Sequence, residues 1–87
     1  MANQQETLPV EQAINLAMEL YNQGQLSQAE SIFQQIVATE PNHPIALHLL
    51  GVIAHQLGSK DSAHDLIAKS IQVKPGYAEA HYNLGNV

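Results

Sequence analysis

The 87-residue sequence contains no cysteine, no tryptophan and no arginine. The absence of cysteine excludes disulfides, thiolate zinc sites and thiol nucleophiles. Lys60, Lys69 and Lys74 are the only cations, so residues 1–59 carry acidic side chains without any Lys or Arg, and the net charge is −5. Because arginine supplies the commonest phosphate clamp and base contact, we expect no nucleic-acid partner.

Long apolar runs are also absent. The most apolar stretch, residues 45–54, spans ten positions and is interrupted by His48 and Gly51. A membrane-spanning helix needs about 20 apolar residues, so we expect no membrane partner. The first residues lack the basic and apolar segments of a signal peptide, which favours a cytoplasmic location.

The sequence repeats itself with a period of 34 residues. Small, apolar and helix-breaking residues return at this spacing: Gly24 and Gly58, Ala29 and Ala63, Pro41 and Pro75, Gly51 and Gly85, and Leu16, Leu50 and Leu84. A period of this length is typical of stacked helix–turn–helix units. The regular spacing therefore predicts an all-α architecture.

The apolar pattern predicts the helices independently of the repeat. Residues 10–22 place Ala13, Leu16, Ala17 and Leu20 on one stripe, expected to pack on a helix over residues 27–39. We interpret Ser27 with Glu30 as a capping box. Pro44 should begin a third helix ending near residue 57, Asp61 should cap a fourth, and a fifth should run from Tyr77 to Val87.

These residues resemble the tetratricopeptide repeat (TPR) family over about residues 10–87. The resemblance rests on Leu16-Ala17, Leu50-Gly51, Leu84-Gly85, Ala29, Ala63, Pro41 and Pro75, whereas the family's aromatic residue early in the first helix is replaced by Ala13, Leu47 and His81. It implies antiparallel helix pairs in a right-handed superhelix. We expect a flexible segment 1–8 and a TPR domain 9–87, with repeats at about 10–43 and 44–77 and a partial repeat at about 78–87.

The sequences of residues 46–55 and 78–87 resemble most the N-terminal repeats of bacterial proteins that are similar to O-linked N-acetylglucosamine transferases. That resemblance implies an alternative function, in which the chain is the substrate-presenting array of a larger glycosyltransferase-like enzyme. Without a transferase domain, the chain alone is not expected to be an enzyme.

A second stripe along the first helix of each unit predicts a groove for a protein or peptide, either helical or extended. The expected lining is Ile14, Asn15, Met18, Tyr21, His48, Leu49, Val52, His55, Gln56, Tyr82, Asn83 and Asn86. Alternatively, Ile14, Met18 and Val52 pack between adjacent repeats. Given the negative charge, we expect an apolar or mildly basic partner.

The family resemblance implies two possible binding modes, a carboxylate clamp and an asparagine ladder. A carboxylate clamp needs cations, but the matching residues are Ile14, Met18, Leu49, Glu79 and Asn83, which excludes it. An asparagine ladder that holds a peptide backbone is matched by Asn15 and Asn83 and interrupted by Leu49. At Asn15 and Asn83 a solvated helix residue explains the pattern equally well.

The histidines and carboxylates suggest no metal site, cofactor site or catalytic group. His43, His48, His55, His64 and His81 include no i, i+4 pair, and His48 and His55 are about 10 Å apart along a helix. We expect histidines to line the groove and to become cationic near about pH 6. Asp61 and Asp65 are expected at a solvated helix start.

The last helix is expected to leave apolar surface uncovered. Leu84 and Val87 would lack the second helix of their repeat. Because TPR arrays usually need about three repeats and a polar capping helix, we expect these residues to form a self-association surface, with a homodimer as the simplest product.

Overall fold

The structure is a computed structural model that describes residues 9–86, which form five α-helices and no strand. They are α1 (Val10–Asn22), α2 (Leu26–Thr39), α3 (Pro44–Gln56), α4 (Lys60–Val73) and α5 (Ala78–Asn86). The segment 1–8 and Val87, for which a flexible N-terminus and a self-association contact were expected, lie outside the described residues.

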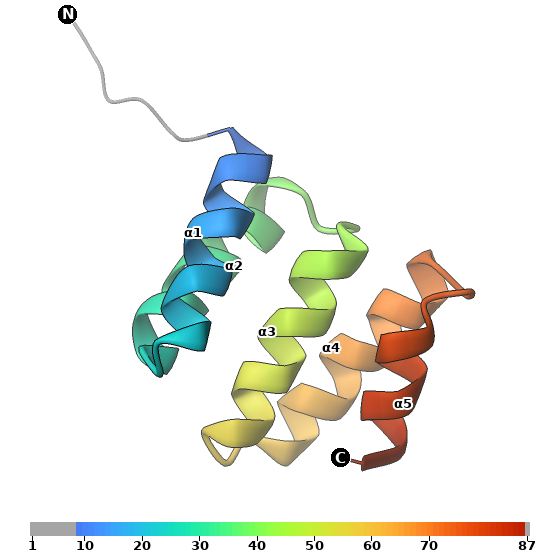
Figure 1. The fold of residues 1–87 in the computed structure, drawn as a ribbon. Helices are drawn as coiled ribbons and strands as arrows, with labels where there is room; N and C mark the ends of the chain where they lie inside the picture. Colours follow the sequence, from blue (N-terminus) through green and yellow to red (C-terminus); the bar gives the residue numbers. More distant parts are fainter. Residues whose placement is uncertain (1–8, 87) are drawn as a thin grey trace, which may run out of the picture.

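The helices follow the 34-residue register and stack in chain order. α1, α3 and α5 begin at equivalent positions 34 residues apart, as do α2 and α4. In Figure 1, α1, α3 and α5 form the front layer, and α2 and α4 lie behind them. The fold is therefore the expected all-α helical repeat.

None of the five helices described within residues 9–86 combines the length and the apolar character that a bilayer crossing requires.

Two glycines make the turns inside the hairpins. Gly24 and Gly58 adopt φ angles of 81° and 94°, a left-handed conformation that other residues rarely adopt. After α1, the N–H of Gly24 donates to the carbonyl of Tyr21 and the N–H of Gln25 to that of Leu20. This pair of bonds is a Schellman motif, and the same pair recurs around Gly58.

The predicted caps of α2 and α4 were wrong. α2 already begins at Leu26, so Ser27 lies inside the helix, and no side-chain cap bond is made at its start. α4 begins at Lys60, which places Asp61 in the first turn, where its charge favours the helix dipole without capping. Each of these helices begins two residues after the turn glycine, so the positions where the caps were expected already have helical backbone. α3 is capped instead by His43, whose Nδ1 accepts from the N–H of Ala46 at 3.3 Å.

The core forms where α3 packs over the first hairpin. Ala17, Ala29, Phe33 and Ile53 are among the fully buried residues of this core. The stripe predicted for α1 was partly wrong, because Leu16 is 39% exposed whereas Ile14 is only 8% exposed. Ile14 is buried because it joins the cluster that includes residues of α3, and it therefore packs between repeats as the alternative interpretation held.

α3 and α4 approach each other closely at Gly51. A Cβ at this position would lie 2.6 Å from Cγ1 of Ile67 and 3.1 Å from the carbonyl oxygen of Ala63. Gly85 is the equivalent residue one repeat later, and a Cβ there would meet no atom within 4 Å. The two glycines thus have the same place in the register and opposite packing demands.

We predict that Gly51→Ala lowers the free energy of unfolding. Overpacking typically costs about 1–3 kcal/mol, and the higher helix propensity of alanine returns about 1 kcal/mol. The expected net loss is about 1 kcal/mol, or a decrease in Tm of about 4–8 °C measured by circular dichroism. Gly85→Ala is the matched control and should leave Tm unchanged or raise it. Equal effects of the two substitutions would contradict the close contact.

Ser70 is a buried polar residue without a hydrogen-bond partner. It is fully buried, and its Oγ has no hydrogen-bond partner. Ile36 occupies the equivalent place one repeat earlier and is an apolar core residue. A buried hydroxyl without a partner loses its hydration and receives no bond in return.

We therefore predict that Ser70→Ala stabilises the fold by about 1 kcal/mol, because it removes this uncompensated hydroxyl. Urea unfolding should show a higher midpoint at an unchanged m-value. Ser62→Ala on the exposed side of α4 provides the comparison and should shift stability by less than about 0.5 kcal/mol. A loss of stability in Ser70→Ala would show that the hydroxyl is compensated in solution.

Candidate functional site

Two adjoining hollows form a groove across the faces of α1, α3 and α5. One has a volume of about 540 Å³ and is lined by Glu11, Ile14, Asn15, Met18, His43, Ile45, Leu49, Tyr77 and Glu79. The other has about 590 Å³ and is lined by Met18, Tyr21, His48, Leu49, Val52, Ala78, Glu79, Tyr82 and Asn83. Since both hollows include Met18, Leu49 and Glu79, they are continuous, and we call them together the groove.

The repeat register explains which residues line the groove. Equivalent positions 34 residues apart supply Ile14, His48 and Tyr82, then Asn15, Leu49 and Asn83, and also Met18 and Val52. A fourth set is formed by Glu11, Ile45 and Glu79. The first helices of successive repeats thus present the same faces to one continuous surface.

The structure places nine of the twelve expected groove residues in the groove. These are Ile14, Asn15, Met18, Tyr21, His48, Leu49, Val52, Tyr82 and Asn83. His55, Gln56 and Asn86 line neither hollow. Gln56 Nε2 donates to the Tyr21 hydroxyl at 2.9 Å, and Asn86 Nδ2 donates to the carbonyl of Tyr82 at 2.9 Å.

The sequence analysis did not identify four further lining residues, which are Glu11, Ile45, Tyr77 and Ala78. His43 was expected there only as one of the histidines, and Glu79 was considered only as a position of a carboxylate clamp. The 34-residue register contained the signal for most of them. His43 and Tyr77 are equivalent residues directly before α3 and α5, and Glu11, Ile45 and Glu79 share the second position of their helices.

His48 lines the groove and is nevertheless almost fully buried. Only 3% of its surface is accessible, and its Nδ1 lies 3.0 Å from the hydroxyl of Tyr77. Its Nε2 lies 2.7 Å from Nδ2 of Asn83, and its ring packs edge-on against the Tyr77 ring with centroids 4.9 Å apart. Burial lowers the pKa of His48 from its ordinary 6.5, and the Glu79 carboxylate partly opposes this effect. His48 thus lines the groove as expected, and the pH at which it becomes cationic stays a prediction.

Neither groove asparagine forms part of a ladder free to hold a peptide. Asn83 is engaged with His48, and Leu49 lies at the position between Asn83 and Asn15 in the register. Asn15 is exposed at the edge of the groove. An asparagine ladder thus lacks its middle member and has one end already bonded.

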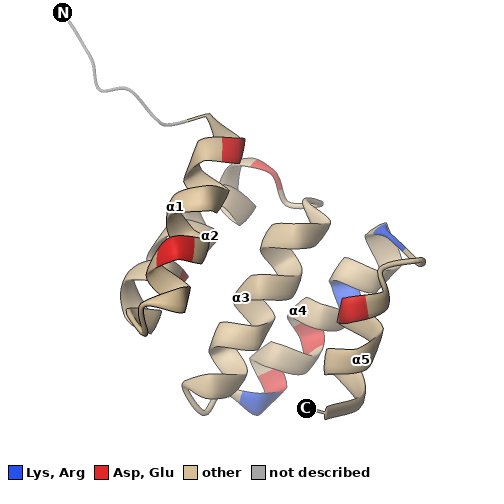
Figure 2. Cartoon of the chain, viewed as in Figure 1, with Lys and Arg blue, Asp and Glu red and all other residues tan. Residues whose placement is uncertain are grey.

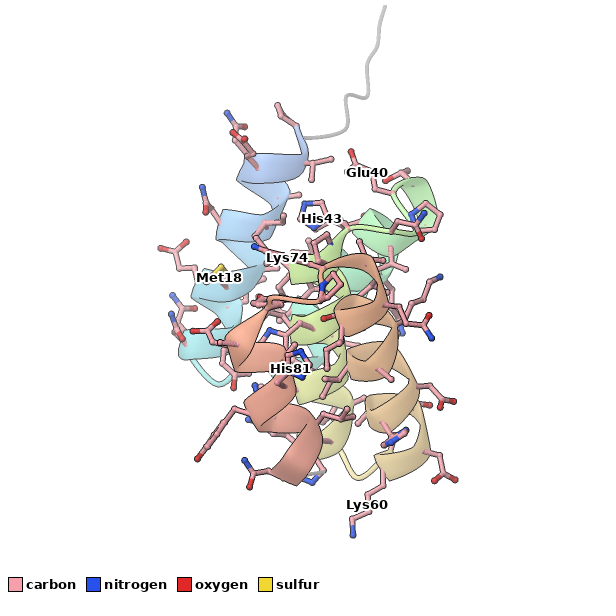
Figure 3. The ribbon with its side chains drawn as sticks, turned by 90° about the vertical axis from the view of Figure 1, so that its right-hand side faces the viewer. Met18, Glu40, His43, Lys60, Lys74 and His81 are labelled. Atoms are coloured by element: carbon pink, nitrogen blue, oxygen red, sulfur yellow. The ribbon has the colours of Figure 1, made fainter. Side chains whose placement is uncertain are left out.

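The charges of the groove are acidic. Glu11 and Glu79 line it, and Figure 2 shows the lysines only on α4 and the turn that follows it. Lys74 in that turn holds its Nζ 5.1 Å from the centroid of the Tyr77 ring. Figure 3 views this side of the molecule, with α5 in front and Met18 and Lys74 labelled.

The described residues hold few groups suited to chemistry. No three histidine or acidic side chains within residues 9–86 lie close enough together to share a metal ion. His64 and Asp65 approach each other at 3.8 Å, but both are exposed on α4. Asp61 is also exposed, as expected of a solvated helix start.

Comparison with protein-family models gave a match to the family described as Tetratricopeptide repeat, over residues 14–77. The chain belongs to the tetratricopeptide repeat family. A comparison with curated protein sequences found no match. The match begins within α1 and includes α2, α3 and α4 entirely, in agreement with the register of the helices. TPR domains generally act as non-catalytic modules that mediate protein–protein interactions. The narrower resemblance to transferase repeats stays a prediction.

The structure describes one of the two residues that were expected to form a self-association surface. Leu84 is half-buried on α5, so part of its side chain is already covered within the chain. Val87 lies outside the described residues. Self-association through this end stays a prediction.

Proposed function

We propose that this TPR domain binds a protein segment in the groove, and that the segment combines apolar anchor residues with a positive charge. The continuity of the two hollows carries this proposal, since together they cross α1, α3 and α5. Each hollow alone is more open than enclosed, whereas a segment lying along both would contact all three helices. Such an arrangement suits an extended peptide or one face of a helix.

The apolar part of the proposal rests on side chains that the fold leaves uncovered. Met18 is 41% exposed and Tyr82 is 74% exposed, and they lie on different helices that line the same hollow. Leu49 and Val52 lie half-buried between them on α3. Removing this surface from water favours binding by roughly 25 cal/mol per Å² of apolar area. A flexible methionine beside tyrosine and branched side chains can adapt to several apolar partners.

The charge of the partner is inferred from Glu79 and Glu11. Glu79 lines both hollows, so it lies beside any segment that occupies the groove. Opposite charge on the partner would accelerate encounter and fix register more than it would raise affinity. A segment with a Lys or Arg next to its apolar residues satisfies both features of the surface.

Selection from a phage-displayed random dodecamer library supplies the probe for this proposal. We predict that the selected peptide binds Met18→Ala about fivefold more weakly at pH 7.5, measured by calorimetry, because the variant loses about 1 kcal/mol of apolar contact. Leu57→Ala is the matched control, since Leu57 directly follows α3, is 44% exposed and lines neither hollow of the groove. Its affinity should stay within about twofold of the parent chain. Equal losses in both variants, or no loss in either, would place the binding surface elsewhere.

We further predict that Glu79→Gln weakens binding of a basic selected peptide by about two- to fivefold at low salt, because it removes a local charge contact of up to about 1 kcal/mol. The salt dependence of Kd should decrease in the same variant. Asp65→Asn changes net charge by the same amount at an exposed residue of α4, and should leave Kd nearly unchanged. A similar effect of both variants would assign the attraction to net charge and contradict a role for Glu79.

A further inference from the structure

α5 forms one wall of the groove and is held from two sides. Its fully buried Ala80 belongs to the packed side of the helix, and α5 lies along α4. On the groove side, both side-chain hydrogen bonds described between α3 and residues 77–86 end on His48. The partners are Tyr77, directly before α5, and Asn83 within it. One imidazole ring therefore holds both the start and the middle of α5.

The fold does not require a histidine at this place. Ile14 is the equivalent residue one repeat earlier, and it is buried at 8% exposure as part of the apolar core. An apolar residue thus satisfies the packing at this position of the repeat. His48 replaces it with a group that can bind a proton, in a position that excludes nearly all solvent.

The hydrogen bonds of His48 fit a neutral ring. Asn83 Nδ2 donates to Nε2, so Nε2 provides a lone pair, and Nδ1–H donates to the Tyr77 hydroxyl. Protonation would place an N–H on Nε2, facing the N–H of Asn83 across 2.7 Å. Two donors cannot share that contact, so either the side chains separate or the amide of Asn83 must rotate.

Few titratable groups surround the ring. On α5, Glu79 favours its charged form; in the preceding turn, Lys74 lies above the ring of Tyr77; and α1 contributes the phenol of Tyr21. The buried residues of α4 are uncharged: Ala63, Ile67 and Ser70. Desolvation outweighs the Glu79 carboxylate and holds the pKa of His48 below 6.5.

We propose that His48 is a proton-sensitive latch that holds α5 in place as a wall of the groove, so that acidification loosens α5 and weakens peptide binding. Only the second part of this inference, the weakening of peptide binding, rests on the proposed function. The first part concerns α5 itself and needs no ligand.

The direction of the pH dependence follows from the lowered pKa. Loosened α5 exposes His48 to water and binds a proton more readily than docked α5 does. Docking is therefore strongest above pH 6.5 and weakens as the pH falls from 6.5 through the lowered pKa, below which no further loss occurs.

The test follows α5 by NMR between pH 7.5 and pH 5.0 on the 87-residue chain. We predict that the His48 ring titrates below pH 6.5, and that the protection factors of α5 amides fall several-fold with the same midpoint. Amides of α2 should keep their protection, since global unfolding would lower both. The Kd of the selected dodecamer should rise several-fold over the same range.

Three variants assign the effect. His48→Gln should abolish the pH dependence of α5 protection, because the glutamine amide can bond Tyr77 and Asn83 but does not titrate. Asn83→Asp should reverse it, since a carboxylate accepts from the protonated ring and favours docking at low pH. His64→Gln, at an exposed position of α4, is the control and should retain the pH dependence of the parent chain.

The two parts of the proposal fail in different ways. Titration of His48 at or above pH 6.5, or α5 protection that does not change with pH, would overturn the latch. Loss of α5 protection without a change in peptide Kd would overturn its link to the groove. The proposed function is judged separately by Met18→Ala and Leu57→Ala at pH 7.5, where His48 is neutral. If α5 responds to pH but no peptide binds, the pH-dependent docking of α5 is supported and the proposed peptide-binding function of the groove is contradicted.

Discussion

The close approach of neighbouring helices is the constraint on which the rest of this structure depends. At the helix crossings the chain places residues with little or no side chain, and these are fully or almost fully buried: Ala17, Ala29, Ala46, Gly51, Ala63 and Ala80. Their small size lets backbones come close enough for larger residues such as Phe33 and Ile67 to fill the space beside them. At Gly51 the distance to Ile67 does not admit even a methyl group.

The groove is a consequence of this stacking. Once the small residues and the core stripe of α1 and α3 face their neighbours, each first helix still has an adjacent face that no helix covers fully. The 34-residue register aligns these faces, so Met18 and Val52 line one surface although they belong to different repeats. A binding surface thus arises from repetition of one unit, and its chemistry varies where the equivalent residues differ, as at Ile14, His48 and Tyr82.

Much of the fold was predictable because it depends on local and periodic signals. A glycine that adopts positive φ ends a helix in the same way at residues 24 and 58, and the period places the next helix after it. The caps were not predictable in this way. Ser27 and Asp61 have the side chains of good caps, but each lies inside its helix because the next helix already begins two residues after the turn glycine. Propensity describes what a residue can do, whereas the turn decides where the helix begins.

The sequence by itself determined the repeat, the order of the helices and the set of positions that face one side, because spacing along a helix fixes direction. Only the tertiary structure decided how far each of those positions is covered. Ile14 and Met18 belong to one predicted stripe, yet the first is buried beside α3 and the second remains exposed. His48 lies in the equivalent stripe of α3 and is enclosed by Tyr77 and Asn83, 29 and 35 residues away along the chain. Burial and pairing of this kind depend on neighbours supplied by other helices, and no local pattern contains them.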